Sequence, residues 1–248
     1  MRLNQVMDDN GAEVASKMDR ESWEKVESDI QSIGEFYDSA ASVISLGMMD
    51  RWRKKAAAET ADGMMVLEVG SGPGSFSRLL HGREIVLLEP NEAMLRKSVR
   101  TELADEKYTP VIGVAEHLPF VDDAFDRVMS GFSFKNFMDK ELALMEIRRV
   151  LDGAGKVVII DIAEPDSGLR KRIMSIYMKH ILGRLAMLVV PRKVRRNWKT
   201  NPWQHLSEEY MKLIKPDNLV MNMKGLGYSS SDYRYMMTHG VAIVTGEK

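Results

Sequence analysis

The chain has 248 residues, of which 44% are hydrophobic and 29% are charged, and its formal net charge is −1. This composition predicts a folded core, argues against a disordered or low-complexity chain, and gives no overall case for nucleic-acid binding. Cysteine is absent, which excludes disulfides and thiolate metal sites, and we expect an intracellular, cytoplasmic chain because neither a leader after Met1 nor a bilayer-spanning apolar run is seen.

Helices are predicted at the start of the chain. From Trp23 to Tyr37 the apolar residues recur at steps of three and four, which is typical of an amphipathic helix. Residues 50–58, rich in Arg, Lys and Ala, form a second expected helix, and Asp62-Gly63 ends it.

The middle of the chain alternates short apolar strands with helices, which predicts a parallel sheet covered on both faces. The expected strands are residues 64–69, 85–89, 111–112, 126–129 and 156–162. The expected helices are residues 76–80, 92–103 and 139–151, the last two with Asn91 and Asp139 as N-caps. Residues 217–226 then predict a helix, and residues 230–237 and 241–245 an antiparallel hairpin.

A glycine-rich loop follows the first strand. Gly70, Gly72 and Gly74 come directly after Glu68, and glycines let a backbone approach a ligand closely at the carboxyl end of a strand. The dinucleotide fingerprint G-x-G-x-x-G would need glycine at Ser75, which counts against a dehydrogenase. An acidic residue two positions before the first glycine suits a ligand with an amino group; the alternative is a tight turn without a ligand.

Two further motifs follow the next strands. Glu89 stands at the tip of the second strand, where a carboxylate can accept both hydroxyls of a ribose. Its alternative role is in a solvated helix N-terminus. Residues 113–126 read GVAEHLPFVDDAFD, and we expect His117 to pack in this loop rather than to act as a base.

Together these three motifs resemble the class I S-adenosylmethionine-dependent methyltransferases. The resemblance implies an α/β fold with a Rossmann-like, doubly wound sheet of seven strands, mostly parallel with an antiparallel strand in the C-terminal hairpin. It implies S-adenosylmethionine as cofactor, S-adenosylhomocysteine as product and no metal. The cofactor-binding residues that it implies are Glu68, Gly70, Ser71, Gly72, Gly74, Glu89, Pro90, Met94, Val114, Ala115, Glu116 and Gly131. Where the family often has Asp, this chain has Val114, so Glu116 or backbone would contact the adenine amino group.

Four features narrow the resemblance to the methyltransferases of ubiquinone and menaquinone biosynthesis. They are the lead-in from Tyr37-Asp38 to Trp52-Arg53, the segment GFSFKNFMD at 131–139, residues 148–151 and THGVA at 238–242. This resemblance implies methyl transfer to a ring carbon of a demethylated prenyl quinol.

The same resemblance implies the catalytic residues. Lys135 and Asn136 would stabilise oxyanion charge on the acceptor, and Tyr37 would lie over the cofactor or the acceptor. The alternatives are a solvated loop lysine and a tyrosine that only packs a helix. Lys135 stands for the family's Arg and Ser133 for a Gly, which leaves open a methyltransferase of another small molecule or lipid.

Charge is unevenly spread along the chain. Between Asp166 and Glu208 there are ten Lys or Arg residues and no acidic residue, interleaved with Ile and Leu. Residues 167–199 therefore suit a helix on an anionic membrane surface, which would make the protein peripheral to a membrane, or an ordinary lid helix with solvated cations. An RNA-binding protein is a less favoured alternative, because this segment has few aromatic residues for stacking.

These observations predict how the chain is divided. Residues 1–60 would be a helical segment that covers the cofactor site, and residues 61–248 the methyltransferase domain. Within it, residues 167–215 would be a basic helical insertion that contacts the acceptor or a membrane. The expected partners are a small-molecule or lipid-like acceptor, an anionic membrane surface and a second copy in a homodimer, with no nucleic acid.

Overall fold

The computed structural model describes residues 18, 20–24, 36–101, 103–192, 215–236 and 239–248. Most of the helix expected from Trp23 to Tyr37 falls outside the described residues, although residues 20–24 are helical. The last part of the basic segment, residues 193–214, also lies outside them.

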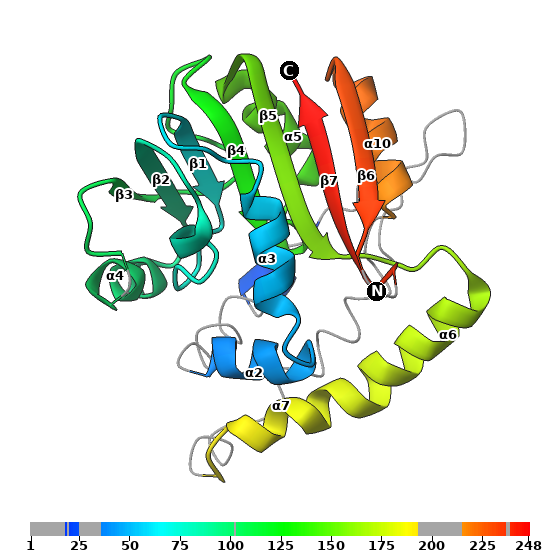
Figure 1. Cartoon of the computed structure of the whole chain (residues 1–248). Coiled ribbons are helices and arrows are strands. Elements are labelled where there is room, and N and C mark those ends of the chain that lie inside the picture. Colours follow the sequence, from blue (N-terminus) through cyan, green and yellow to red (C-terminus); the bar gives the residue numbers. More distant parts are fainter. Residues whose placement is uncertain (1–17, 19, 25–35, 102, 193–214, 237–238) are drawn as a thin grey trace.

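A sheet of seven strands forms the centre of the molecule, in the order β3-β2-β1-β4-β5-β7-β6 (Figure 1). The strands are β1 (Met65–Val69), β2 (Glu84–Glu89), β3 (Tyr108–Ile112), β4 (Phe125–Gly131), β5 (Leu151–Ile162), β6 (Ser230–Tyr235) and β7 (Val241–Glu247). The first five are parallel, and β7 pairs antiparallel with both β5 and β6. The strand order reverses between β1 and β4, which is where open α/β sheets bind ligands.

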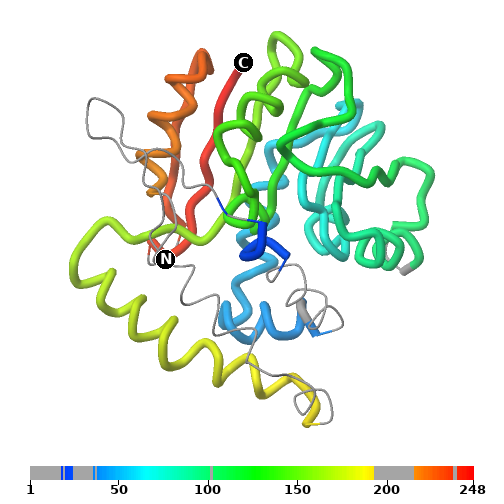
Figure 2. Tube along the Cα trace, turned by 180° about the vertical axis from the view of Figure 1, so that it is seen from behind, coloured from blue at the N-terminus to red at the C-terminus, as the bar shows by residue number. Residues whose placement is uncertain are grey.

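Seven helices with described bounds surround the sheet. They are α2 (Tyr37–Ile44), α3 (Met49–Ala57), α4 (Glu92–Thr101), α5 (Lys140–Val150), α6 (Gly168–Ile176), α7 (Gly183–Val189) and α10 (Pro216–Gly225). Helix α3 on one side and α5 and α10 on the other pack against the faces of the sheet. Helix α3 lies on one face in Figure 1, whereas α5 and α10 come to the front when the molecule is seen from behind in Figure 2.

The strand sequences explain the two layers. Neighbouring residues of a strand point to opposite faces, and β1 is apolar at both: Val66 packs with the α3 layer and Leu67 with the α5 layer. A strand that is buried on both sides needs such a continuous apolar run. The predicted parallel sheet and antiparallel hairpin are therefore confirmed.

Both predicted helix caps form, but one of the predicted helices does not. Asn91 Oδ1 accepts from Met94 N, and Asp139 Oδ1 accepts from Leu142 N, each at 3.1 Å. The helix expected at residues 76–80 is wrong: only the 3-10 turn η1 (Ser77–Leu79) forms. Too few residues separate the glycine loop from β2, and the chain is already extended at Leu80.

The segment after β5 forms one long helix at the edge of the molecule (Figure 1). Helices α6 and α7 are joined by a π-helical turn, η3 (Tyr177–Leu182). A small apolar cluster joins this helix to α2, in which Ala40 packs with Met178, Leu182 and Ala186. Among the described residues no helix is both long enough and apolar enough to cross a bilayer.

Candidate functional site

A cavity of about 850 Å³, including its open mouth, lies at the carboxyl ends of β1, β2 and β4. It coincides with the reversal of strand order, and its walls include residues of all three predicted motifs. The predicted site residues that line it are Gly70, Ser71, Gly72, Glu89, Pro90, Met94, Val114, Ala115, Glu116, Gly131 and Asn136.

The glycine loop forms the floor of the cavity. Gly70 has φ +74°, and a Cβ there would lie 2.6 Å from Ser133 Cβ, so only glycine fits between β1 and the turn after β4. The backbone nitrogens of Gly70 and Ser71 donate to Leu88 O at 2.8 and 3.2 Å, which ties the loop to β2. Gly74 is not on the cavity wall, because it packs against Leu103 behind the loop.

Glu89 joins two of the three motifs. Its carboxylate is buried; Oε2 accepts from Gly72 N at 2.9 Å, and Oε1 accepts from Asn91 N at 3.1 Å. These bonds fix the carboxylate at the cavity wall, beside the loop. A carboxylate held in this way can receive further hydrogen bonds from a vicinal diol.

Glu68 lies beneath the loop rather than on the cavity wall. It is 1% exposed, and its Oε2 makes no hydrogen bond within the described residues. Burial raises the pKa of its carboxyl to about 8, while the nearby Ser77 hydroxyl and the Arg53 charge act in the opposite direction. A cationic ligand above the loop would stabilise its ionised form.

The sequence reading missed Arg53 as a site residue. It is 4% exposed although it carries a charge, it lines the cavity from α3, and its Nε has no hydrogen-bond partner within the described residues. Its Nη1 lies 3.3 Å from Asp38 Oδ1 and 3.6 Å from Asp50 Oδ1. The only available signal was its place in the Trp52-Arg53 pair.

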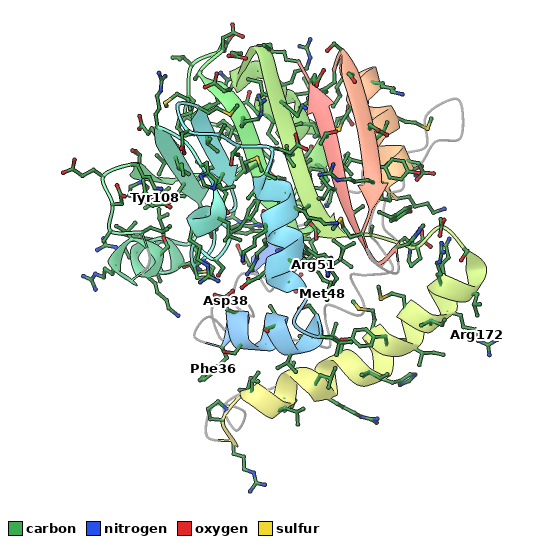
Figure 3. All side chains as sticks on the ribbon, viewed as in Figure 1. Phe36, Asp38, Met48, Arg51, Tyr108 and Arg172 are labelled. Carbon is green, nitrogen blue, oxygen red and sulfur yellow. The ribbon has the colours of Figure 1, made fainter. Side chains whose placement is uncertain are left out.

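Asp38 connects α2 to this wall. It lies on the side of α2 nearest α3 (Figure 3), and its Oδ2 accepts a hydrogen bond from Ser75 Oγ just after the glycine loop. The same carboxylate thus holds Arg53 and the loop. Tyr37 begins α2, but its side chain lies outside the described part of the structure.

The loop after β3 supplies the opposite wall with Val114, Ala115 and Glu116. Glu116 is buried, and its Oε1 accepts from Asp139 N at 3.1 Å, at the start of α5. One of its oxygens is therefore engaged in holding α5. Backbone groups of this loop remain the simpler expected contact for an adenine amino group.

The segment after β4 closes the cavity. Phe132 has φ +62°, a left-handed conformation that is uncommon outside glycine, and Ser133 Oγ donates to Val69 O at 2.9 Å. This bond locks the segment to the end of β1. The turn η2 (Phe134–Asn136) then places Asn136 on the cavity wall.

Lys135 points elsewhere. Its Nζ lies 3.3 Å from Asp161 Oδ1 and donates to Phe132 O, and its backbone nitrogen donates to Asp161 Oδ2 at 2.9 Å. The side chain is 11% exposed and faces a smaller apolar hollow beside β5, β7 and α10. The structure therefore brings Asn136, but not Lys135, to the cavity wall.

The cavity fits the expected cofactor at its amino-acid end. S-adenosylmethionine has a carboxylate, an ammonium group and a ribose diol. Buried polar groups are normally paired, yet Arg53 Nε and the Ser71 hydroxyl, both on the cavity-lining residues, and Glu68 Oε2 beneath the loop are unpaired within the described residues. The positive charge of Arg53 and the negative charge of ionised Glu68 are complementary to the carboxylate and the ammonium group of an amino acid.

Comparison with known proteins identifies a family whose sequence model matches most of this chain. The model of the ubiE/COQ5 methyltransferase family matches residues 17–248. A demethylmenaquinone methyltransferase of Deinococcus radiodurans is 31% identical over 243 residues, which cover 94% of this chain and 95% of the relative. A ubiquinone/menaquinone biosynthesis C-methyltransferase UbiE of Idiomarina loihiensis is 29% identical over 229 residues, with 88% of each chain covered.

Solved structures share the fold. A SAM-dependent methyltransferase of Thermotoga maritima has a TM-score of 0.60 at 16% identity and covers 88% of this chain and 99% of its own. A SAM dependent methyltransferase of Aquifex aeolicus has a TM-score of 0.55 at 14% identity, with 84% and 97% covered. At these identities the likeness shows the fold alone, and it confirms the class I methyltransferase arrangement expected from the motifs.

Proposed function

Because this chain belongs to the ubiE/COQ5 methyltransferase family, we propose that it transfers the methyl group of S-adenosylmethionine to a ring carbon of a demethylated prenyl quinol. Membership makes the chain a SAM-dependent methyltransferase with a small-molecule acceptor. The quinol is supported by the names of the relatives at 31% and 29% identity. The observation that carries the proposal is the cavity in which Arg53, Glu89 and the loop above Glu68 meet.

Each end of the cofactor has a matching group in this proposal. Arg53 holds the α-carboxylate, Glu68 supplies negative charge beneath the ammonium group, and Glu89 accepts from the ribose hydroxyls. The loop at Val114 and Ala115 encloses the adenine. Among the described residues before 61, Trp23 and Arg53 line the cavity, which supports the predicted role of this segment as a cover for the site.

The chain's main task is alignment, since bound S-adenosylmethionine supplies a methyl group on a positively charged sulfur that is already activated for displacement. The loop and Arg53 fix the donor end, and enclosure of the cavity by Phe132 and Phe137 excludes water from the reacting groups.

The acceptor needs activation as well. A ring carbon attacks well only when its neighbouring hydroxyl is ionised, and a free phenol titrates near ~10. We propose that the Asn136 amide donates a hydrogen bond to this oxygen and stabilises its developing charge, while the hydroxyl proton and then the proton of the methylated ring carbon pass to water at the mouth of the cavity. Lys135 acts as a positioning residue, because its contacts with Asp161 and Phe132 O fix the turn that carries Asn136. The direct oxyanion role of Lys135 stays a prediction.

The test is a transfer assay with S-adenosylmethionine labelled in the methyl group. The purified chain is incubated with a reduced, demethylated quinol of short prenyl chain, with the same quinol already methylated, and with a crude lipid extract. Label on a ring carbon of the first quinol alone is the expected result, with mass fragmentation separating C-methyl from O-methyl. Label only in another lipid would keep the methyltransferase and remove the quinol.

A further inference from the structure

We infer that the outward face of the long helix formed by α6, η3 and α7 is a docking surface for an anionic lipid bilayer. Large apolar side chains are exposed along this helix. They are Leu169, Ile173, Ile176, Ile181 and Leu188, with exposed fractions between 42% and 75%. A row of this kind in a water-exposed helix indicates an interaction site.

The spacing puts these residues on one side. Leu169, Ile173 and Ile176 are separated by steps of four and three, and Ile181 and Leu188 by seven, so each group shares a helix face. The opposite side is already used, because Met178, Leu182 and Ala186 pack on Ala40 of α2. Each turn of the π-helical segment η3 contains more residues than a turn of an α-helix. Residues spaced by four therefore stay on the side that faces α2 along this helix.

Exposed cations occur along the same segment of the chain. Arg172, Lys179, Arg184 and Arg192 are exposed, and none of them makes an ion pair with another described residue. Arg172 projects away from the body of the molecule in Figure 3. By contrast, Arg170 and Lys171 are paired with Asp166 and Glu164 at 2.9 and 2.8 Å. The sequence has no acidic residue from 167 to 207 to neutralise the others.

This chemistry selects the partner. Apolar side chains enter the acyl boundary of a bilayer while flanking Lys and Arg meet acidic headgroups, and both contributions strengthen binding. RNA would use the cations and leave the apolar row in water. A second copy of the same helix would bury the row but bring like charges together. An anionic bilayer satisfies both sets of side chains at once.

The docked helix would lie close to the cavity. Tyr177 donates a hydrogen bond to Ile44 O of α2, and Asp38 of the same α2 contacts Arg53 and Ser75 at the cavity wall. A single short helix thus separates the docking surface from the cofactor site. The docking surface is inferred from its own side chains, whereas its use in collecting a lipid-like acceptor rests on the proposed function.

The first experiment is sedimentation of the full chain with vesicles of phosphatidylcholine alone or mixed with phosphatidylglycerol, at low and high salt. We expect binding only to the mixed vesicles and its loss at high salt. The variant Leu169→Ser/Ile173→Ser/Ile176→Ser should bind at least about tenfold more weakly. The variant Arg172→Gln/Lys179→Gln/Arg184→Gln should lose about fivefold for each cation removed.

Matched controls are exposed residues of the same kinds elsewhere. Val121→Ser and Met221→Ser remove apolar side chains that are 76% and 61% exposed outside the helix, and Lys224→Gln removes a cation from α10. These variants should bind vesicles as the parent chain does. Equal losses in the controls and in the helix variants would overturn the inference.

Three further outcomes would also overturn it: no binding to mixed vesicles at low salt, salt-sensitive binding of RNA without vesicle binding, or self-association that the three Ser substitutions abolish. Calorimetric titration of each variant with S-adenosylmethionine checks the cofactor site separately. Helix variants that bind the cofactor and methylate a water-soluble acceptor normally, yet fail on vesicles, support the docking surface. Failure of the cofactor titration in the parent chain would count against the proposed function and leave the vesicle result standing.

Discussion

The carboxylate of Glu89 accepts a hydrogen bond from the backbone nitrogen of Gly72, with 2.9 Å between Oε2 and N. The contact joins the tip of β2 to the loop after β1, so two motifs that are separate in the sequence hold each other in place. A hydrogen bond to a charged group contributes about 1.5–3 kcal/mol. Glu89 therefore shapes the loop as well as offering oxygens to a ligand.

Glu89→Ala should weaken binding of S-adenosylmethionine about a hundredfold, because it removes the proposed ribose acceptor and the anchor of Gly72. Calorimetric titration measures the affinity, and circular dichroism checks that the fold persists. Glu84→Ala, at the other end of the same strand, is the matched control. Equal losses at both positions would mean that strand stability, and not the ribose contact, sets the affinity.

The affinity for S-adenosylmethionine should rise with pH from 6 towards 8. Glu68, whose pKa is raised by burial to about 8, is protonated in the free protein below that pH. Binding of an ammonium group favours the ionised carboxylate, so a proton is released on binding. Titration in buffers of different ionisation enthalpy counts that proton. Glu68→Gln should release none, and proton release that persists in this variant would assign it to another group.

The same carboxyl should make the ligand-free protein less stable as the pH rises. Its folded pKa lies above the ordinary value of 4.5, so the folded state binds more protons than the unfolded state between pH 4.5 and about 8. The free energy of unfolding then falls as the pH rises through that range. Thermal melting at several pH values measures this, and Glu68→Gln should flatten the dependence.

Arg53→Gln should lower the affinity for S-adenosylmethionine by about ten- to a hundredfold, the effect of losing a charged hydrogen bond. The circular dichroism spectrum should stay unchanged, since its partners Asp38 and Asp50 are both partly exposed. Lys54→Gln removes the same charge from an exposed position on the same helix. An equal loss of affinity in Lys54→Gln would mean that the net charge of α3, and not the position of Arg53, determines the affinity.

Lys135→Met should lower both stability and turnover, because it leaves the carboxylate of Asp161 without its cation; breaking such a pair costs about 3 kcal/mol. Adding Asp161→Asn removes the uncompensated charge and keeps an acceptor for the Lys135 backbone nitrogen. Melting temperature and turnover should then recover together. Recovered stability with turnover still low and cofactor affinity normal would instead assign Lys135 the direct oxyanion role.

Much of the fold could be predicted from the sequence because its signals are local. Continuous apolar runs such as the one at Val66 and Leu67 indicate a strand buried on both faces, and Asn91 and Asp139 cap the helices that follow them. The glycine loop and Glu89 were equally visible, since each follows a strand. Each of these features can be predicted from residues that are close together in the sequence.

The remaining features depend on contacts between distant residues. Arg53 is flanked in the sequence by Arg51, Lys54 and Lys55, and this pattern predicts a solvated helix face. In the structure Arg53 is the one of these four residues that is buried, whereas the other three are exposed. Lys135 is held by Asp161, 26 residues further along the chain, so its departure from the cavity could not be foreseen. The π turn η3 likewise packs on α2 through Met178 and Leu182, a contact that its own composition does not indicate.

The sheet order has a consequence for aggregation. Strand β6 forms an edge and pairs with β7, which follows it in the chain and separates it from β5. Detachment of β7 would therefore open two strand edges at once, because β5 and β6 both pair with it. Open strand edges promote association between chains. Substitutions that loosen β7 should thus raise the yield of aggregates more than equally destabilising substitutions in the other edge strand, β3.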